Sequence, residues 1–437
     1  MTNSFEYVQH PRRALPPPIP TGRGPAAAFL PGTFHPINPK QIAPGSDQVL
    51  LSGWGKFLRW LLVLASIFAI IVGINLILDG VYNVGTTSTN RLYDLARDPF
   101  IGLLIGILTT ALVQSSTTTT TLTVAAVGTG IVTVPVAIPI IMGANIGTTI
   151  TALLVSFSYM GERREFKKAF TTAAMHLWFN VLVVLVALTI EMLFHPLQTI
   201  SGDLADKVLG SSETTVPTTH IVEDITTPIV DTIGTHGLFG MVGNGGVATA
   251  LSLITGTLFI LVAIKVMSYQ LRMITAATTH SLLDMFSSPE ENTRLTLKAN
   301  TLGVGVGLLF TIMVTASSVT VSSMQPFAVT KSLPRRAMLA VILGANVGTT
   351  LTAMIATFAI VGVHGAFALQ AALVHLTLNL VGALVVLCVP SLGRAITNLA
   401  AGSARLAARS YTRTIVTIFG MFMVFPIIIL VIYALMN

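Results

Sequence analysis

A stretch of 62 residues, from Pro99 to Met160, contains no Asp, Glu, Lys, Arg or His. It is longer than two helical crossings of a bilayer, each of which needs about 20 residues. Polar side chains nevertheless occupy its middle, because Gln114 begins a run of eight consecutive polar residues that ends at Thr121. A lipid-facing helix would leave these groups unsatisfied, so the segment must face protein or water, which favours a re-entrant or broken helix.

The composition of the whole chain agrees with a membrane location. Of its 437 residues, 53% are hydrophobic and 9% are charged, against about 25% charged in soluble domains. These values exclude a soluble fold and predict an all-α polytopic membrane protein. The single cysteine, Cys388, excludes an intrachain disulfide and a Cys-based zinc site. The net charge of +7 reports a bias of cytoplasmic loops, so no nucleic-acid partner is expected.

The chain contains an internal duplication. Residues 143–152 and 344–353 are identical at eight of ten positions. Both blocks are flanked by the same elements in the same order: Ser115, Ser116, His176 and Asn180 around the first, and Ser317, Ser318, His375 and Asn379 around the second. Accidental matches do not keep register over about 80 residues, so the two halves are predicted to be structural repeats.

The placement of charges predicts the orientation of these repeats. Basic residues precede a first span at about 60–78 and occupy the loop 163–168, so both segments are expected inside. Between Glu191 and Leu238 seven acids accompany one base, which places this segment outside. The first polar hairpin is then entered from outside and the second from inside. The fold is predicted to consist of two inverted-topology repeats, each with a re-entrant or broken helical hairpin that carries a Gln-Ser-Ser-type motif, as in alternating-access carriers.

These boundaries divide the chain into five expected parts. They are a disordered, Pro-rich cytoplasmic tail (1–50), a first transport repeat with its leading span (51–194), an external acidic and Thr-rich loop (195–240), a second transport repeat (241–390), and an interfacial helix with a last span (391–437).

The polar hairpins have the chemistry of an ion site. Hydroxyls, carboxamides and unwound carbonyls are hard oxygen donors that suit small alkali cations, sodium foremost. The helix starts at each break offer N–H groups to anions. Neither polar block contains Lys or Arg, so a divalent anion held there would need countercharge from co-bound cations. The pattern therefore predicts cation-coupled anion transport, with no catalytic residue and no cofactor besides sodium as co-substrate.

The candidate ligands are the polar residues of both halves: Gln114, Ser115, Ser116, Thr117, Thr118, Asn145, Thr148, Thr149, Ser317, Ser318, Asn346, Thr349 and Thr350, with His176, Asn180, His375 and Asn379 in supporting positions. Ser and Thr in membrane helices also pack closely or bond to their own helix, which is the alternative for each hydroxyl. The two asparagines of the repeated blocks either break a helix or bind an ion. The two histidines either make a structural hydrogen bond or have a proton-sensing or site role.

These motifs resemble one known family, the type II sodium-dependent phosphate cotransporters. The resemblance rests on Gln114-Ser115-Ser116 with its hydroxyl run, on the sequence of residues 138–149, on residues 161–166 (Gly-Glu-Arg-Arg-Glu-Phe), and on His176 with Phe179-Asn180. It covers about residues 57–390 and implies a bacterial member in the plasma (inner) membrane with a cytoplasmic N-terminus. It also implies phosphate and sodium as partners besides the lipid bilayer. The residues that it carries over as ligands are Gln114, Ser115, Ser116, Thr117, Ser317 and Ser318.

Two positions depart from the family pattern. Ala316 stands where the family's second glutamine is expected. Leu177 follows the histidine of the His-x-x-x-Asn element, where electrogenic members have an Asp. The resemblance therefore implies an electroneutral cycle of about two sodium ions for each divalent phosphate, which moves no net charge.

Three other functions compete with this interpretation. A carrier of the same fold could transport another oxyanion, such as sulfate or arsenate, because tetrahedral oxyanions share their geometry. An intramembrane hydrolase would use Ser115 or Ser116 with His176, but the chain has no Gly-x-Ser-x-Gly elbow. A scaffold that binds a partner through its external loop would not need polar hairpins at membrane depth.

Overall fold

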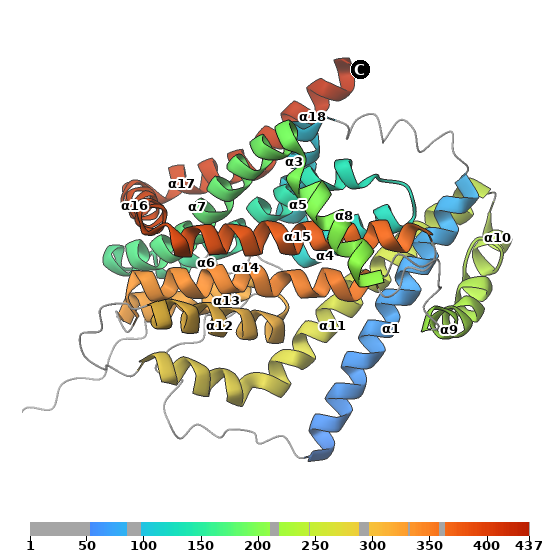
Figure 1. Cartoon of the computed structure of the whole chain (residues 1–437), viewed down its shortest axis with the longest axis horizontal. Helices are drawn as coiled ribbons and strands as arrows, with labels where there is room; N and C mark the ends of the chain where they lie inside the picture. Colours follow the sequence, from blue (N-terminus) through green and yellow to red (C-terminus); the bar gives the residue numbers. More distant parts are fainter. Residues whose placement is uncertain are drawn as a thin grey trace, which may run out of the picture. The chain divides into compact units, whose positions relative to one another are not determined.

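The computed structural model describes residues 53–84, 98–209, 218–243, 245–287, 297–330, 333–357 and 363–436. The expected tail at 1–50 lies outside these ranges. The described part is helical throughout and contains no strand, which confirms the all-α class (Figure 1).

The first half of the chain forms the helices α1 (Gly53–Val84), α3 (Pro99–Val113), α4 (Ser116–Gly128), α5 (Val134–Gly147), α6 (Thr149–Val155), the 3-10 turn η3 (Ser156–Tyr159) and α7 (Arg163–Phe194). The middle segment that was expected as a loop contains α8 (Pro196–Leu209), α9 (Thr218–Ile233) and α10 (Leu238–Val242). The second half forms α11 (Gly245–Ser287), α12 (Leu297–Val314), α13 (Ser317–Thr330), α14 (Arg335–Thr357) and α15 (Val363–Cys388). The chain continues through α16 (Pro390–Ala407), α17 (Tyr411–Phe419), a π-helical turn (Gly420–Val424) and α18 (Phe425–Met436).

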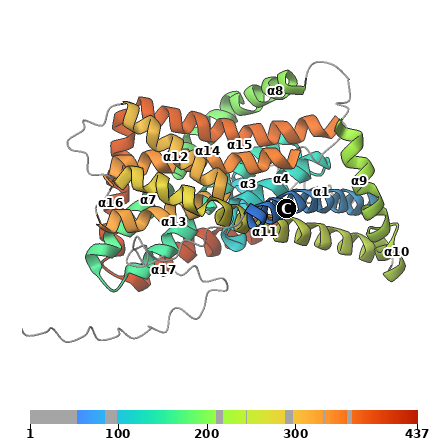
Figure 2. The same ribbon diagram turned by 90° about the horizontal axis from the view of Figure 1, so that it is seen from below.

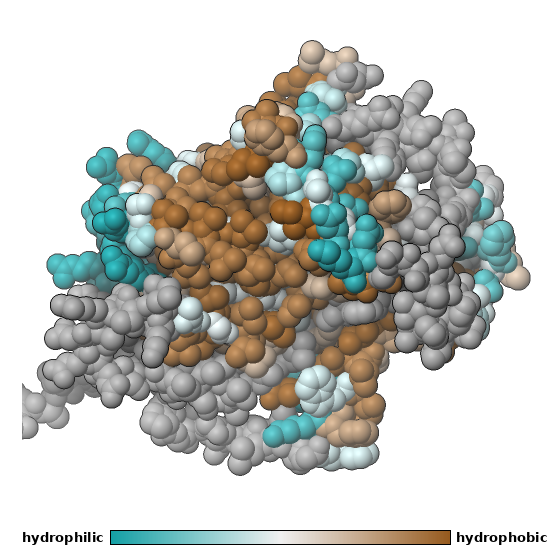
Figure 3. Space-filling model, in the orientation of Figure 1, coloured by the Kyte–Doolittle hydropathy of each residue, from teal (hydrophilic) through white to brown (hydrophobic). Residues whose placement is uncertain are grey.

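Six helical segments of the described chain are long and apolar enough to cross a membrane. They are Trp54–Ile77, Val134–Tyr159, Arg163–Phe194, Gly245–Met267, Gly365–Cys388 and Tyr411–Met436. Large apolar side chains remain exposed on these segments, such as Leu185 and Val186 on α7 and Leu384 on α15. Figure 3 shows the result as a broad hydrophobic surface over the middle of one face, with hydrophilic residues at its left edge and over α8. The chain is a multi-pass membrane protein, as its composition predicts.

The two halves use matching helix pairs. Helix α3 packs along α5 in the first half, and α12 packs along α14 in the second. Figure 2 shows α12, α14 and α15 as neighbours, and α14 contacts both of the others. Helix α4 packs on α5, α14 and α15, whereas α13 packs on α6, α7 and α14. Each polar hairpin therefore lies against helices of both halves.

Glycines set the close approach within each pair. A Cβ on Gly106 would overlap the backbone oxygen of Ile140, and one on Gly143 would overlap that of Leu103. The second half repeats this crossing, where Gly307 meets the Val341 oxygen and Gly344 meets the Val304 oxygen. Small residues at helix crossings let backbones approach closely in membranes. The glycines of the repeated blocks thus have a packing role.

The polar run ends one helix and begins the next. Asp98 starts α3 by accepting hydrogen bonds from the backbone N–H groups of Phe100 (2.8 Å) and Ile101 (3.2 Å). The helix stops at Gln114, whose left-handed backbone (φ 59°) turns the chain into α4. In the second half α12 stops at Thr315, which has nearly the same φ of 55°. Only two other described residues have positive φ, His195 and Gly130, so the break is a specific feature of both hairpins.

Candidate functional site

The tip of the first hairpin is built by a serine cap. Ser115 is extended, and its Oγ accepts hydrogen bonds from the backbone N–H of Thr118 at 3.2 Å and from the Thr118 hydroxyl at 3.0 Å. A capping hydroxyl satisfies one of the free N–H groups in the first turn of a helix. The other N–H groups of this turn stay available to an anion.

The second hairpin has the same geometry at an offset of 201 residues. In the first half, Thr110 Oγ1 donates to Thr119 Oγ1 at 2.9 Å. The equivalent hydroxyls of Thr311 and Thr320 lie 2.6 Å apart. These bonds fix each hairpin by joining its two helices.

This match corrects the predicted alignment of the two tips. The left-handed residues correspond, so Gln114 is equivalent to Thr315. Ser115 is therefore equivalent to Ala316, and Ala316 does not occupy the glutamine position as we expected from the sequence. The error arose because the Ser-Ser pairs were aligned by residue type, whereas the helix break sets the register. Ala316 has no side-chain oxygen, so α13 lacks the serine cap of α4.

Most hydroxyls of the Thr run bond within their own helix. Thr119, Thr120 and Thr123 donate to the carbonyl oxygens four residues earlier, at 3.3, 2.8 and 2.8 Å. This is the structural alternative that the sequence left open. A hydroxyl that donates to a carbonyl still has two lone pairs, so these bonds do not prevent it from binding a cation.

Thr117 differs because its hydroxyl leaves the helix. Thr117 Oγ1 donates to the backbone oxygen of Thr315 at 2.8 Å, a contact between residues 198 positions apart. Ser116, Thr117 and Thr118 are buried beside this contact, as are Ser317 and Ser318 at the start of α13. The two hairpin tips therefore meet, and both helix starts lie at the meeting point.

Gln114 lies on the exposed side of its tip. Its side-chain Nε2 donates to the Ala111 oxygen at 2.8 Å, and its Oε1 accepts from Thr151 Oγ1 at 3.0 Å. Gln114 is exposed, whereas Ser115 is half-buried. The amide thus ties the tip of the first hairpin to α6.

The His-x-x-x-Asn elements bond to the asparagines of the opposite half. His375 Nε2 lies 3.2 Å from Asn145 Oδ1, and Asn379 Nδ2 donates to the same oxygen at 3.3 Å. Reciprocally, His176 Nε2 lies 3.4 Å from Asn346 Oδ1. Because a carboxamide oxygen only accepts, each contact needs the proton on Nε2. All five side chains are buried, and the two histidines are 0% exposed.

These contacts bear on the alternatives for the two asparagines. Helix α14 runs through Asn346 without a break, so helix breaking is wrong as the role of Asn346. Asn145 lies in the last turn of α5, which ends at Gly147 before α6 begins at Thr149. The second amide bonds are within the helix, from Asn145 Nδ2 to Ile141 O (3.2 Å) and from Asn346 Nδ2 to Ile342 O (2.9 Å). Both oxygens are used by the opposite half, which favours a structural role that joins the repeats.

The threonines after each asparagine follow one pattern. Thr149 and Thr350 donate to the carbonyl oxygens of Ile146 and Val347, both at 2.7 Å. Thr349 donates to Ala345 O at 2.9 Å. Together with Thr148 they are buried in α5, α6 and α14, which pack on α4 or α13. These four candidates lie in the helices around the tips.

Sequence analysis missed two polar groups. Gln325 on α13 is fully buried; its Nε2 donates to the Ala152 oxygen at 2.8 Å, and its Oε1 has no partner among the described residues. Asp79 on α1 accepts from the backbone N–H and the hydroxyl of Thr235, both at 2.7 Å, and from Ser252 Oγ at 2.9 Å. Gln325 could have been identified from the sequence as a polar residue inside an apolar segment. Asp79 could have been identified as a lone carboxylate at the end of the first span.

The fold and the site define the class of this chain as a multi-pass helical membrane protein with two matched polar helix breaks. The sequence profile of the Na+/Pi-cotransporter family matches residues 69–204 and 258–407. The chain therefore belongs to this family, which confirms the resemblance found from its motifs. The family is one of transporters, and the expectation that the chain is not an enzyme is confirmed with it.

Characterised relatives share shorter segments. The chain is 36% identical over 151 residues to the sodium-dependent phosphate transport protein 2B of Pongo abelii, which covers 34% of this chain and 22% of the relative. Identity to the human 2B protein is 37% over 146 residues (33% and 21%), and to the mouse 2A protein 34% over 151 residues (34% and 24%). The matches thus span less than a quarter of each relative. No solved structure matches the chain.

Proposed function

We propose that the protein is a symporter that carries inorganic phosphate into the cell together with sodium, by alternating access. The observation that carries this proposal is the bond from Thr117 Oγ1 to the Thr315 oxygen, which brings the two hairpin tips together. Its relatives are named as sodium-dependent phosphate transport proteins, which supports the choice of substrate and ion.

The tips suit an anion and cations at once. Helices α4 and α13 begin there, and their first-turn N–H groups favour a phosphate oxygen. The hydroxyls of Ser115, Ser116, Thr117, Ser317 and Ser318 are sodium ligands of the right hardness. Neither hairpin contains Lys or Arg between Pro99 and Met160 or between Lys298 and Lys331. Sodium then supplies the positive charge that phosphate needs in a low dielectric.

The inverted arrangement of the repeats is part of the proposal. Equivalent bonds at Thr110–Thr119 and Thr311–Thr320, and the reciprocal His–Asn contacts, agree with a twofold relation between the halves. The basic segment at 163–168 and the acids between Glu191 and Leu238 give the proposed orientation, with the N-terminus in the cytoplasm and the protein in the plasma (inner) membrane. Rocking of one half against the other would then expose the tips to each side in turn.

Sodium dependence is the first prediction. Uptake of radiolabelled phosphate into proteoliposomes that contain the full chain should rise with external sodium. Potassium or choline should not replace sodium, because only sodium is bound with the phosphate. Equal uptake in the three salts would contradict the coupling. Excess unlabelled sulfate or arsenate tests the other oxyanions: strong competition by sulfate would favour the alternative substrate.

The second prediction separates ligands from packing hydroxyls. Ser115→Ala should reduce phosphate uptake by about tenfold or more, since a lost hydrogen bond to a charged group costs about 1.5–3 kcal/mol. Gln114→Ala should also reduce uptake, because it removes the amide that ties the tip to Ala111 and to Thr151 on α6. Thr120→Val is the matched control, because Thr120 bonds only within α4, to Ser116 O and Thr117 O. It should keep near-normal uptake. Normal uptake by both tip variants, at equal protein levels in the membrane, would show that the polar residues of the hairpin serve helix packing and do not bind the transported ions.

A further inference from the structure

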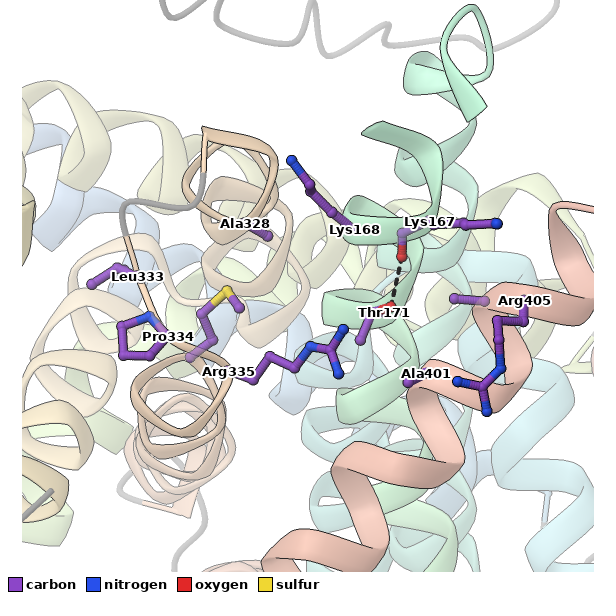
Figure 4. A pocket seen from close by; sticks show the side chains of 11 residues that line it. Lys167, Lys168, Thr171, Ala328, Leu333, Pro334, Arg335, Ala401 and Arg405 are labelled. Atoms are coloured by element: carbon purple, nitrogen blue, oxygen red, sulfur yellow. Dashed lines mark hydrogen bonds between the residues drawn. The ribbon is translucent and has the colours of Figure 1, made fainter. Parts of the chain in front are cut away.

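A cavity of about 530 Å³ opens away from the hairpin tips, between the start of α7, the corner before α14, and α16 (Figure 4). Four cationic side chains line it: Lys167 and Lys168 from α7, Arg335 from α14 and Arg405 from α16. The proposed transport site uses none of these residues. Among the described residues that line the cavity, none is Asp or Glu.

The four cations are brought together by helix packing. Helix α16 packs along α7, and α14 contacts both α7 and α16. Lys168 Nζ donates to the backbone oxygen of Val329 at 2.7 Å, which ties α7 to the end of α13. Figure 4 shows the guanidinium group of Arg335 extending from α14 toward Thr171 on α7. Like charges that line one cavity repel one another, and an anion bound between them would relieve this repulsion.

Apart from Thr171, the remaining lining is apolar. Leu333, Met338, Ala401 and Ala404 line the cavity and are buried. The cavity also lies at the N-terminal end of the apolar segment Arg163–Phe194, where a membrane helix meets the headgroup region. An anion with an attached apolar chain fits this cavity better than a fully hydrated ion does, because the four cationic side chains and the apolar side chains line the same cavity.

We propose that this cavity binds the phosphate group of an anionic phospholipid headgroup. Guanidinium groups bind phosphate oxygens in a bidentate manner, and lysines add point charges. Basic pockets between membrane helices bind such headgroups as a general rule. The bound headgroup bridges α7 of the first half to α14 of the second, and it therefore stabilises the arrangement of the halves seen here.

The test measures lipid binding, independently of transport. Full-length protein in nanodiscs of mixed phosphatidylcholine and phosphatidylglycerol is released into detergent, and the retained phosphatidylglycerol is counted by native mass spectrometry. Each cation near a membrane surface contributes about fivefold in affinity, so R335Q and R405Q should each lower retention about fivefold and the double variant about 25-fold. The controls are R164Q and R409Q, which remove exposed cations close to α7 and α16 that do not line the cavity.

A second arm identifies the source of the phosphate. Delipidated protein in detergent is titrated with inorganic phosphate or with short-chain phosphatidylglycerol, and its thermal stability is followed. Stabilisation by the lipid that is lost in the double variant supports the proposal. Stabilisation by inorganic phosphate alone would assign the cavity to the free ion and overturn the lipid. Equal retention in the cavity variants and the controls would overturn the site itself, and gel filtration verifies that every variant is folded.

Discussion

Gly344→Ala is expected to destabilise the protein strongly, although it adds only one methyl group. The new Cβ would overlap the backbone oxygen of Val304, and it would also lie 2.8 Å from the backbone nitrogen of Leu308. Backbone atoms cannot rotate away as a side chain does, so α12 and α14 must separate along their contact. Overpacking typically costs about 1–3 kcal/mol, and the overlap with backbone atoms places this variant at the upper end of that range. Thermal unfolding of the purified protein should show the loss, and Gly143→Ala should show the same loss in the first half.

Gly305→Ala is the matched control for this effect. Gly305 lies on α12, the helix that meets Gly344, but a Cβ there would have no atom within 4 Å. Alanine also favours a helix over glycine by about 1 kcal/mol. The control should therefore be neutral or slightly stabilising. Equal melting temperatures for Gly344→Ala and Gly305→Ala would show that the glycine crossing does not determine the packing of α12 on α14.

The sequence predicted the class and the helix breaks because these depend on local composition. An uncharged stretch of 62 residues with a polar centre has few solutions in a bilayer, and the observed break at Gln114 is one of them. The glycine crossings were less visible. Gly143 and Gly344 belong to the repeated polar blocks, which we interpreted as candidate ion sites. Gly106 and Gly307 are isolated glycines in apolar segments. A lone glycine does not identify the backbone that it faces.

The site was predicted as a set of residues without its connections. Contacts between His375 and Asn145 or between Thr117 and Thr315 join positions about 200 residues apart, and no local pattern encodes them. Duplication shows which residues are equivalent, but it leaves open whether equivalent residues pair within one half or across the two. The structure pairs them across, so each half supplies the histidine that orients the other half's asparagine.

The reciprocal pairing suits the alternating access that we propose. A carrier of inverted repeats needs joints that keep both halves together while their contacts change. Thr117 donates from one tip to the backbone oxygen of Thr315 in the other at 2.8 Å. Ser318 is the equivalent of Thr117 at the offset of 201 residues, and its hydroxyl makes no such bond to the first tip among the described residues. The tips are thus asymmetric within a symmetric frame of His–Asn contacts. In the proposed transport cycle, the outward-open and inward-open states differ in which contacts the two tips make, so an asymmetric contact between the tips is expected in either state.

Phosphate uptake is expected not to depend on voltage, a prediction that rests on the proposed transport function. With two sodium ions for each divalent phosphate no net charge moves, so uptake into sealed vesicles should stay constant when potassium and valinomycin impose a potential. A third cation would move one charge, and 100 mV would then bias the cycle by up to about 2.3 kcal/mol, or about 50-fold. Strong voltage dependence in the unmodified protein would contradict the electroneutral cycle.

Leu177→Asp tests the position to which this stoichiometry is assigned. Leu177 follows His176 on α7 and packs against the apolar core. An aspartate there adds a carboxylate one residue after His176, within the membrane-capable segment Arg163–Phe194, where it can hold a further cation. The variant should gain voltage dependence, whereas Leu177→Asn, which has nearly the same shape without the charge, should not. Gain of voltage dependence by both would assign it to altered packing of α7, and gain by neither would show that the charge moved is set by the hairpin tips alone.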